Sequence, residues 1–276
     1  MLQRDVFPEY RKMCDFNNSF YKELKGRFNL ETDINELCEL RGYLPNSDQY
    51  NLMAEMGIGI CTLLDKEMLT ETAKKYGYLN TSGFFLLDDR FIIPVRDICG
   101  NIVTLIGYYP DRKKYITVPT PFFSKDLMFF NIDDAYIRSW EEYNGMVVLV
   151  EGIFDCLSLR SIGLPAIATM GSDVSSAKRE ILKSFGKVLY IPDNDVVGRR
   201  ALNRYDKMHG WKVPANATGI RLGGSVDFNE EGMTDESKII RIKDTDNLVT
   251  WFDADSVRES ILQFANSREE IVSLEI

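Results

Sequence analysis

Histidine and paired cysteine are almost missing from this sequence, which has one histidine, His209, and five scattered cysteines without a C-x-x-C pair. Zinc sites and histidine-based catalytic triads need more imidazole or clustered thiolates, so the composition argues against both. The cysteines are typical of reduced thiols rather than of a disulfide framework. Any bound metal should therefore be a hard cation with oxygen ligands, Mg²⁺ or Mn²⁺, and we expect no zinc.

Long hydrophobic runs and an excess of positive charge are absent as well. No apolar run approaches the roughly 18 residues of a membrane helix, and the first residues, MLQRDVFPEYRK, lack the apolar core of a signal peptide. We therefore expect a cytoplasmic protein. The 33 Lys and Arg residues stand against 42 Asp and Glu, a net charge of −9. This balance argues against a large non-specific contact with duplex DNA, but it allows a local basic groove.

The pattern of apolar residues and turn signals changes along the chain and predicts four parts. Hydrophobic residues make up 45% of the sequence, enough for a substantial core. Alternation of apolar residues and turn signals predicts a mainly helical segment at residues 1–80, a β-rich basic subdomain at 81–145, an α/β domain at 146–233 and a partly helical C-terminal segment at 234–276.

The third part carries the clearest fold signal. Short apolar runs, MVVLV, LPAIA, KVLYI and ATGIRL, alternate there with amphipathic helical stretches. Strands without a polar face imply a sheet that is covered on both sides. The sequence therefore predicts an α/β fold in which a mainly parallel sheet is flanked by helices.

Acidic residues follow several of these predicted strands. In LYIPDNDVVGRRA, Asp193 and Asp195 lie two apart, so they project from one face and repel each other unless a cation binds between them. Glu151 ends the first strand, and Asp227 follows the fourth. Each has an ordinary alternative as a turn or helix cap. Because ligands bind beyond the carboxyl ends of parallel strands, the four together favour a shared metal site.

The same stretches resemble a known family. EGIFD, DND-x-x-G-R-R-A and D-F-N-E resemble the acidic motifs of the TOPRIM domain, which places that domain at residues 146–233. Upstream, DDRFIIPVRDICGNIVTLIGYY and KKYITVPTPFFSKDLMFFN are similar to segments of bacterial-type DNA primases. The resemblance covers about residues 39–232. It matches a compact catalytic core without the zinc-binding domain, so we expect a phage or another mobile element as the source.

The resemblance implies synthesis of short RNA primers from ribonucleoside triphosphates on single-stranded DNA. Two Mg²⁺ or Mn²⁺ ions would assist this reaction, with Asp193, Asp195 and Asp227 as ligands. Glu151 is either a further ligand or the group that takes the hydroxyl proton. Asp155, one helical turn later, either faces the same site or only interacts with the dipole of its helix.

The resemblance also implies basic residues that bind triphosphate and template. Arg90, Lys114 and Lys125 occupy the basic positions of the family, and Lys113 and Arg96 are weaker candidates. A replicative helicase or another replication protein is an expected partner, and a membrane is not.

Two other functions stay open. A TOPRIM nuclease would use the same carboxylates to cleave, and an inactive module would only recruit a helicase or polymerase. The basic β-rich half favours primase over nuclease, and the intact set of carboxylates argues against an inactive module. A chain of 276 residues leaves little room for the strand-gate domains of a topoisomerase.

Overall fold

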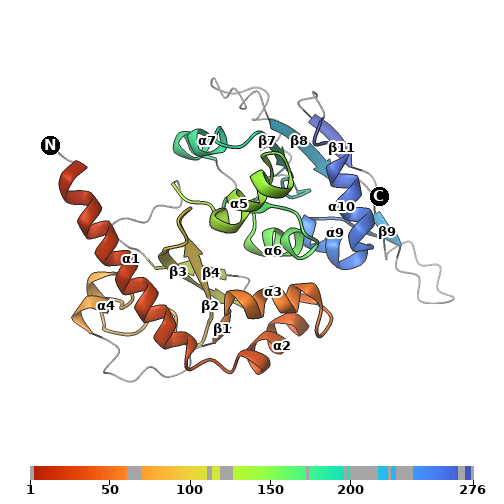
Figure 1. Ribbon diagram of the computed structural model, residues 1–276. Coiled ribbons are helices and arrows are strands. Elements are labelled where there is room, and N and C mark those ends of the chain that lie inside the picture. Colours follow the sequence, from red (N-terminus) through yellow and green to blue (C-terminus); the bar gives the residue numbers. More distant parts are fainter. Residues whose placement is uncertain are drawn as a thin grey trace. The chain divides into compact units, whose positions relative to one another are not determined.

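The computed structural model of the chain divides into two compact units, Met1–Ser124 and Lys125–Ile276 (Figure 1). It describes residues 3–60, 70–110, 114–118, 127–171, 174–195, 198, 217–222, 225–227, 239–266 and 271–274. None of the helices in these segments combines the length and the apolar character that crossing a bilayer requires. The boundaries of the four parts expected from the sequence stay predictions.

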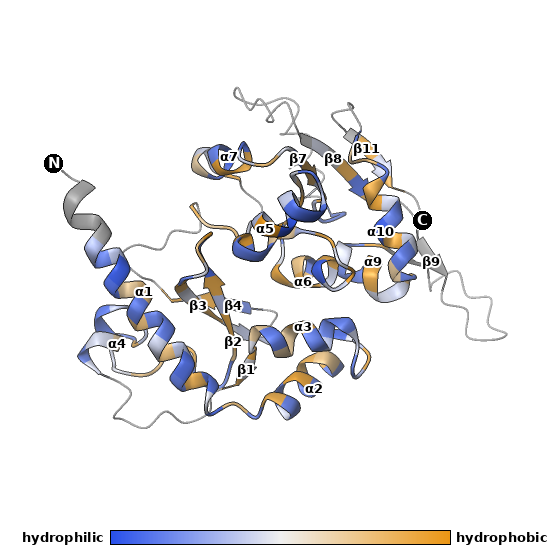
Figure 2. Cartoon of the chain, viewed as in Figure 1, coloured by the Kyte–Doolittle hydropathy of each residue, from blue (hydrophilic) through white to orange (hydrophobic). Residues whose placement is uncertain are grey.

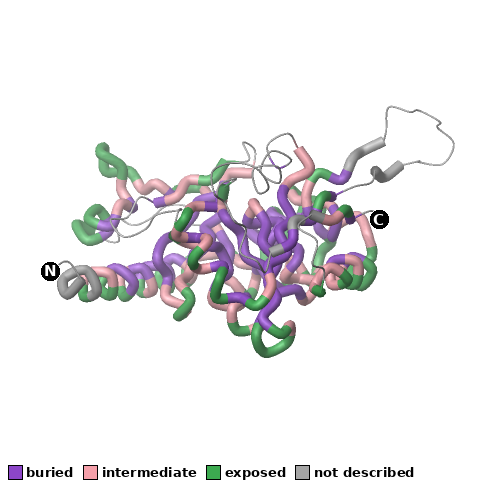
Figure 3. Tube along the Cα trace, turned by 90° about the horizontal axis from the view of Figure 1, so that it is seen from above, coloured by how far each residue is buried: buried purple, intermediate pink, exposed green. Residues whose placement is uncertain are grey.

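Helices dominate the beginning of the first unit. Their bounds are α1 (Gln3–Lys25), α2 (Leu30–Arg41), α3 (Asp48–Met56) and α4 (Glu71–Lys75). Buried and exposed residues alternate along α1, as expected of a helix that packs on one face (Figure 3). Ser47 caps α3 by accepting a hydrogen bond from the backbone of Tyr50, and Gly42, with φ of 76°, ends α2 in the left-handed conformation.

An antiparallel sheet with the order β1-β2-β3-β4 completes the first unit. Its strands are β1 (Gly59–Ile60), β2 (Phe91–Arg96), β3 (Ile102–Tyr109) and β4 (Lys114–Thr117). Strands β2 and β3 form a hairpin, and Gly100 has φ of 82° in the turn between them, a conformation that glycine adopts readily. Both strands are largely hydrophobic (Figure 2) and buried.

The second unit is built on a five-stranded sheet with the order β11-β8-β7-β5-β6. Its strands are β5 (Met146–Val150), β6 (Ala166–Ala168), β7 (Lys187–Tyr190), β8 (Ala217–Leu222) and β11 (Ile271–Leu274). All neighbouring pairs are parallel. The predicted parallel sheet is therefore confirmed. A separate antiparallel pair joins β9 (Ser225–Asp227) to β10 (Ile239–Arg241).

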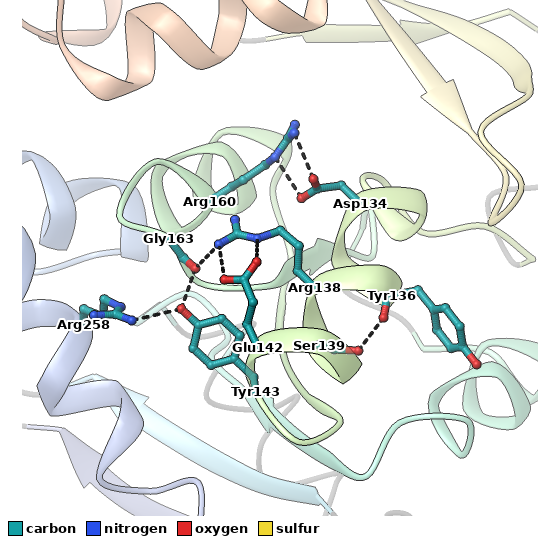
Figure 4. A network of polar contacts seen from close by, with 9 residues as sticks. All are labelled: Asp134, Tyr136, Arg138, Ser139, Glu142, Tyr143, Arg160, Gly163 and Arg258. Atoms are coloured by element: carbon teal, nitrogen blue, oxygen red, sulfur yellow. Dashed lines mark hydrogen bonds and ion pairs between the residues drawn. The ribbon is translucent and has the colours of Figure 1, made fainter.

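Helices of the second unit carry its polar cross-links. They are α5 (Ile132–Glu142), α6 (Ile153–Ser161), α7 (Ser176–Leu182), α9 (Thr245–Trp251) and α10 (Ala254–Leu262). Arg138 of α5 and Tyr143 both donate to the carbonyl oxygen of Gly163, at 2.8 and 2.7 Å (Figure 4). Arg258 of α10 donates to the Tyr143 hydroxyl at 3.1 Å. This network ties α5 and α10 to the loop that follows α6.

Candidate active site

The carboxyl ends of β5 and β7 bring the first acidic residues together. These strands are neighbours, with Leu149 opposite Tyr190 in the register. Glu151 follows β5 directly, and Asp193 lies three residues beyond the end of β7. Because parallel strands end at the same edge, both acidic residues leave the sheet on that side. The charges of Asp193 and Asp195 both raise the pKa of Glu151, so these three residues predicted from the sequence interact electrostatically.

Glu151 holds a carboxylate atom without a partner. Its Oε1 is buried and forms no hydrogen bond with the described residues. Burial, and then the charges of Asp193 and Asp195, raise the pKa of Glu151 to about 7. A buried oxygen without a donor is unfavourable, so this atom suits a proton or a bound cation.

The turn after β7 fixes the other two carboxylates. Burial raises the pKa of Asp193 to about 6, and the charges of Asp244 and Asp195 act in the same direction, while Lys243 opposes them. The backbone N–H of Gly198 donates to Oδ1 of Asp195 at 2.8 Å. A Cβ atom at Gly198 would overlap the carbonyl oxygen of Asp193, so this turn can close only around glycine.

Asp155 interacts with other acidic residues and with the start of α9. It lies in the first turn of α6 and is buried. Its Oδ1 accepts hydrogen bonds from the Thr245 hydroxyl and from the backbone N–H of Asp246, both at 3.1 Å. Burial is the largest cause of its raised pKa, followed by the charges of Asp244, Asp193 and Asp246. The start of α9 therefore lies against the first acidic motif.

Asp244 and Asp246 are the functional candidates that the sequence analysis missed. Asp244 caps α9 by accepting a bond from the backbone of Asn247, and its charge raises the pKa values of Asp155 and Asp193. Asp246 is buried and accepts a hydrogen bond from the Ser158 hydroxyl at 2.5 Å. The signal was present in the sequence, because KDTD repeats the two-residue spacing of Asp193 and Asp195 at the start of a helix.

Several predicted residues belong to other elements or lie outside the described residues. Asp227 ends β9, and its backbone pairs with Ile239 of β10, whereas its side chain lies outside the described residues. Lys113 and Lys125 lie outside the described residues too. The remaining cations, Arg90, Arg96 and Lys114, belong to the first unit.

These cations differ in their surroundings. Arg96 donates from Nη1 to the carbonyl oxygen of Gly100 at 2.9 Å, which ties it to the hairpin turn. Arg90 is half-buried and donates from Nε to the carbonyl oxygen of Leu86 at 3.3 Å. Lys114, on β4, is exposed.

The acidic residues have the chemistry of a site for a divalent cation. Within the described part of the chain, no three acidic, histidine or cysteine side chains stand in an arrangement that could already hold a metal ion. The candidate ligand atoms are nevertheless all oxygens, and their like charges oppose one another. Oε1 of Glu151 also lacks a hydrogen-bond donor among the described residues. A cation bound by oxygen would relieve both the repulsion and the missing bond, so the residues fit Mg²⁺ or Mn²⁺.

Comparison with known proteins identifies the domain to which these acidic residues belong. Residues 148–232 match a family model described as Toprim-like, which implies use of a divalent metal. The DNA primase of Thermotoga maritima is 29% identical over 208 residues, which are 72% of this chain and 35% of that protein. The chain thus spans about a third of the length of this relative.

Solved structures extend the similarity to nearly the whole chain. The RNA polymerase domain of the Mycobacterium tuberculosis primase DnaG has a TM-score of 0.66 at 17% identity, and the match covers 92% of this chain and 86% of that one. The chain has the fold of a bacterial primase catalytic core. A DnaG primase catalytic domain bound to single-stranded DNA gives a TM-score of 0.65 at 17% identity, with 93% and 80% covered. The resemblance to a bacterial-type primase core is thereby confirmed.

Proposed function

We propose that this chain is a DNA primase core that joins ribonucleotides into short primers on single-stranded DNA. The observation that carries the proposal is the group of carboxylates at the carboxyl edge of the parallel sheet, where Oε1 of Glu151 is buried without a hydrogen-bond partner among the described residues. Its support from relatives is the similarity to DNA primases and to a primase domain bound to single-stranded DNA.

The carboxylates would hold two Mg²⁺ or Mn²⁺ ions. Glu151, Asp193 and Asp195 come from the motifs identified in the sequence, and Asp244 joins them through its effect on Asp193. Bound divalent ions would activate the attacking hydroxyl and stabilise the leaving pyrophosphate. Asp227 stays a candidate ligand from the sequence.

Glu151 and Asp155 would have different tasks. Oε1 of Glu151 is free of protein donors among the described residues, and its pKa near 7 also suits a group that takes a proton at neutral pH. Asp155 is engaged by Thr245 and Asp246, so it would position the segment that carries Asp244.

Nucleotide triphosphates and the DNA template need positive charge. Arg90 and Lys114 are our first choices among the described cations, and Lys125, Lys113 and Arg96 remain candidates. A cytoplasmic location, in the host if the gene belongs to a phage, and cooperation with a replicative helicase complete the proposal.

The test is a joining assay with labelled ribonucleotides, single-stranded DNA and Mg²⁺. We expect short labelled products that disappear with a chelator and return with Mg²⁺ or Mn²⁺ but not with Zn²⁺. Cleavage of the template without product synthesis would instead identify a nuclease. If the protein forms no product, leaves the template uncut and captures a helicase, it is a recruiting module.

A further inference from the structure

Three residues of the first unit form a row across the antiparallel sheet. Phe91, the first residue of β2, pairs with Tyr108 of β3, and Arg90 precedes β2 with its guanidinium over the Tyr109 ring. Tyr109 in turn pairs with Lys114 of β4. Directly opposed residues of antiparallel strands project from the same face. One face of the sheet therefore presents a cation, an aromatic ring and a second cation in succession.

The first cation of this row is held in place. Cζ of Arg90 lies 5.5 Å from the centroid of the Tyr109 ring, within the range of a cation–π contact. Nε of Arg90 donates to the carbonyl oxygen of Leu86 at 3.3 Å. A Cβ atom at Gly107 would lie 2.7 Å from Cδ of Arg90, so the arginine stem crosses the sheet in the space left by this glycine. These contacts direct the guanidinium to Tyr109.

The two cations of the row have no acidic partner within the described part of the chain. Arg90 and Lys114 form no ion pair with any residue that the structure describes, although Asp88 and Asp89 are exposed nearby in the sequence. Tyr109 and Lys114 lie on adjacent strands, whose backbones are about 4.8 Å apart, and the Arg90 guanidinium reaches the Tyr109 ring, so both charges are carried by one end of this face. A chain of phosphates, with a charge at every nucleotide, is the ligand chemistry that fits two such cations on one face.

We propose that Tyr109 is a positioning residue, whose ring holds Arg90 so that Arg90 and Lys114 bind two phosphates of one nucleic-acid strand. The inference rests on the proposed function, because it names how the basic half engages a single strand. Tyr109 acts through Arg90 and need not touch the nucleic acid.

The first experiment measures binding of fluorescent oligo(dT) by anisotropy at several salt concentrations. Arg90→Ala and Lys114→Ala should each weaken binding and lower the salt slope by about 0.7, the value for one phosphate contact on a single strand. Tyr109→Leu should weaken binding about two- to fivefold, the range of a partly exposed cation–π contact. Tyr109→Phe keeps the ring and should bind as the parent does.

The second experiment tests whether Tyr109 acts through Arg90. In an Arg90→Ala background, Tyr109→Leu should cause no further loss, because the ring then has no guanidinium to hold. Tyr115→Leu is the matched control. Tyr115 lies next to Lys114 on β4 and projects from the opposite face, so any effect of its loss should add to that of Arg90→Ala. Thermal unfolding of each variant checks that the fold is intact.

The outcomes separate this inference from the proposed function. An equal loss from Tyr109→Leu in both backgrounds, or no loss in the parent, would overturn the role of Tyr109. Unchanged binding in Arg90→Ala would overturn it too, even if the protein joins nucleotides. If the binding defects of Tyr109→Leu and Arg90→Ala are coupled but the protein joins no nucleotides, the role of Tyr109 is supported and the proposed primase activity is rejected.

Discussion

The backbone N–H of Asp246 donates to Oδ1 of Asp155 at 3.1 Å, across 91 residues of sequence. The Thr245 hydroxyl donates to the same oxygen, also at 3.1 Å. Both donors belong to the first turn of α9, so α9 is fixed against α6 at the point where the acidic residues gather. The segment after β10 is therefore part of the candidate site, and its own D-x-D pair competes with Asp227 for the role of metal ligand.

Asp244→Asn tests this competition directly. The change keeps the shape of the side chain and its ability to cap α9, but it removes the charge that acts on Asp193. We expect the rate of Mg²⁺-dependent joining to fall about tenfold to a hundredfold, while the melting temperature stays unchanged. Asp227→Asn, measured in parallel, should have a smaller effect. A large loss of joining activity in Asp227→Asn and no loss in Asp244→Asn would identify Asp227 as the metal ligand.

Asp193→Ala and Asp195→Ala should abolish joining while the fold stays intact. Asp193→Ala removes one member of a set of like charges, so the metal-free variant should be as stable as the parent or more stable. Asp195→Ala also loses the hydrogen bond from Gly198, which offsets part of this gain. Joining rates and urea unfolding in the absence of metal provide the two measurements. Joining at the parental rate in either variant would show that the metal site lies elsewhere.

The acidic group also predicts how stability depends on pH. Burial and neighbouring charges raise the pKa of Glu151 from 4.5 to about 7, so the folded protein binds this proton more tightly than the unfolded chain. The resulting stability is fully present below pH 4.5 and is lost as the pH rises through about 7. We expect a loss of about 1 to 2 kcal/mol, after allowance for solvent screening.

Glu151→Gln supplies the control for this pH dependence. Glutamine has the same shape and does not titrate, so unfolding in a chelator should lose this part of its pH dependence between pH 5 and 8. Bound Mg²⁺ should also remove it in the parent, because a cation replaces the proton. An identical pH profile in the parent and the variant would contradict the assignment.

Much of the second unit could be predicted from the sequence, because its signals are local. The apolar runs of β5 and β7 have no polar face, which only a covered sheet explains, and an acidic residue follows each of them. Asp244 was missed because β10, the strand before it, has three residues and pairs with β9 outside the main sheet. The contact of Asp155 with α9 joins residues far apart in sequence, and no pattern along the chain records it.

Asn17 provides a test of the first unit. It is buried on α1, and its Nδ2 donates to the carbonyl oxygens of Ile102 and Val103 at 3.1 and 3.0 Å, while its Oδ1 accepts from the Tyr78 hydroxyl at 2.8 Å. Asn17→Ala would leave these three buried groups without their partner. We expect a loss of about 2–4 kcal/mol in the free energy of unfolding by urea. Asn18→Ala removes a single bond to the backbone of Ile102 and should cost about 1 kcal/mol.

Gly198 provides the sharpest test of the turn that carries Asp193 and Asp195. Its N–H donates to Asp195, and a Cβ atom there would overlap the Asp193 carbonyl oxygen, so Gly198→Ala must push the two carboxylates out of position. The turn lies beyond the end of β7, so the sheet can keep its packing while the site is displaced. We expect joining to fall by about a hundredfold or more, because small errors in the placement of catalytic groups are costly. Gly171→Ala is the matched control: Gly171 follows β6 at the edge of the same sheet, and a Cβ atom there meets no atom within 4 Å. Joining by Gly171→Ala should stay near the parental rate, and an active Gly198→Ala would show that this turn does not hold the site.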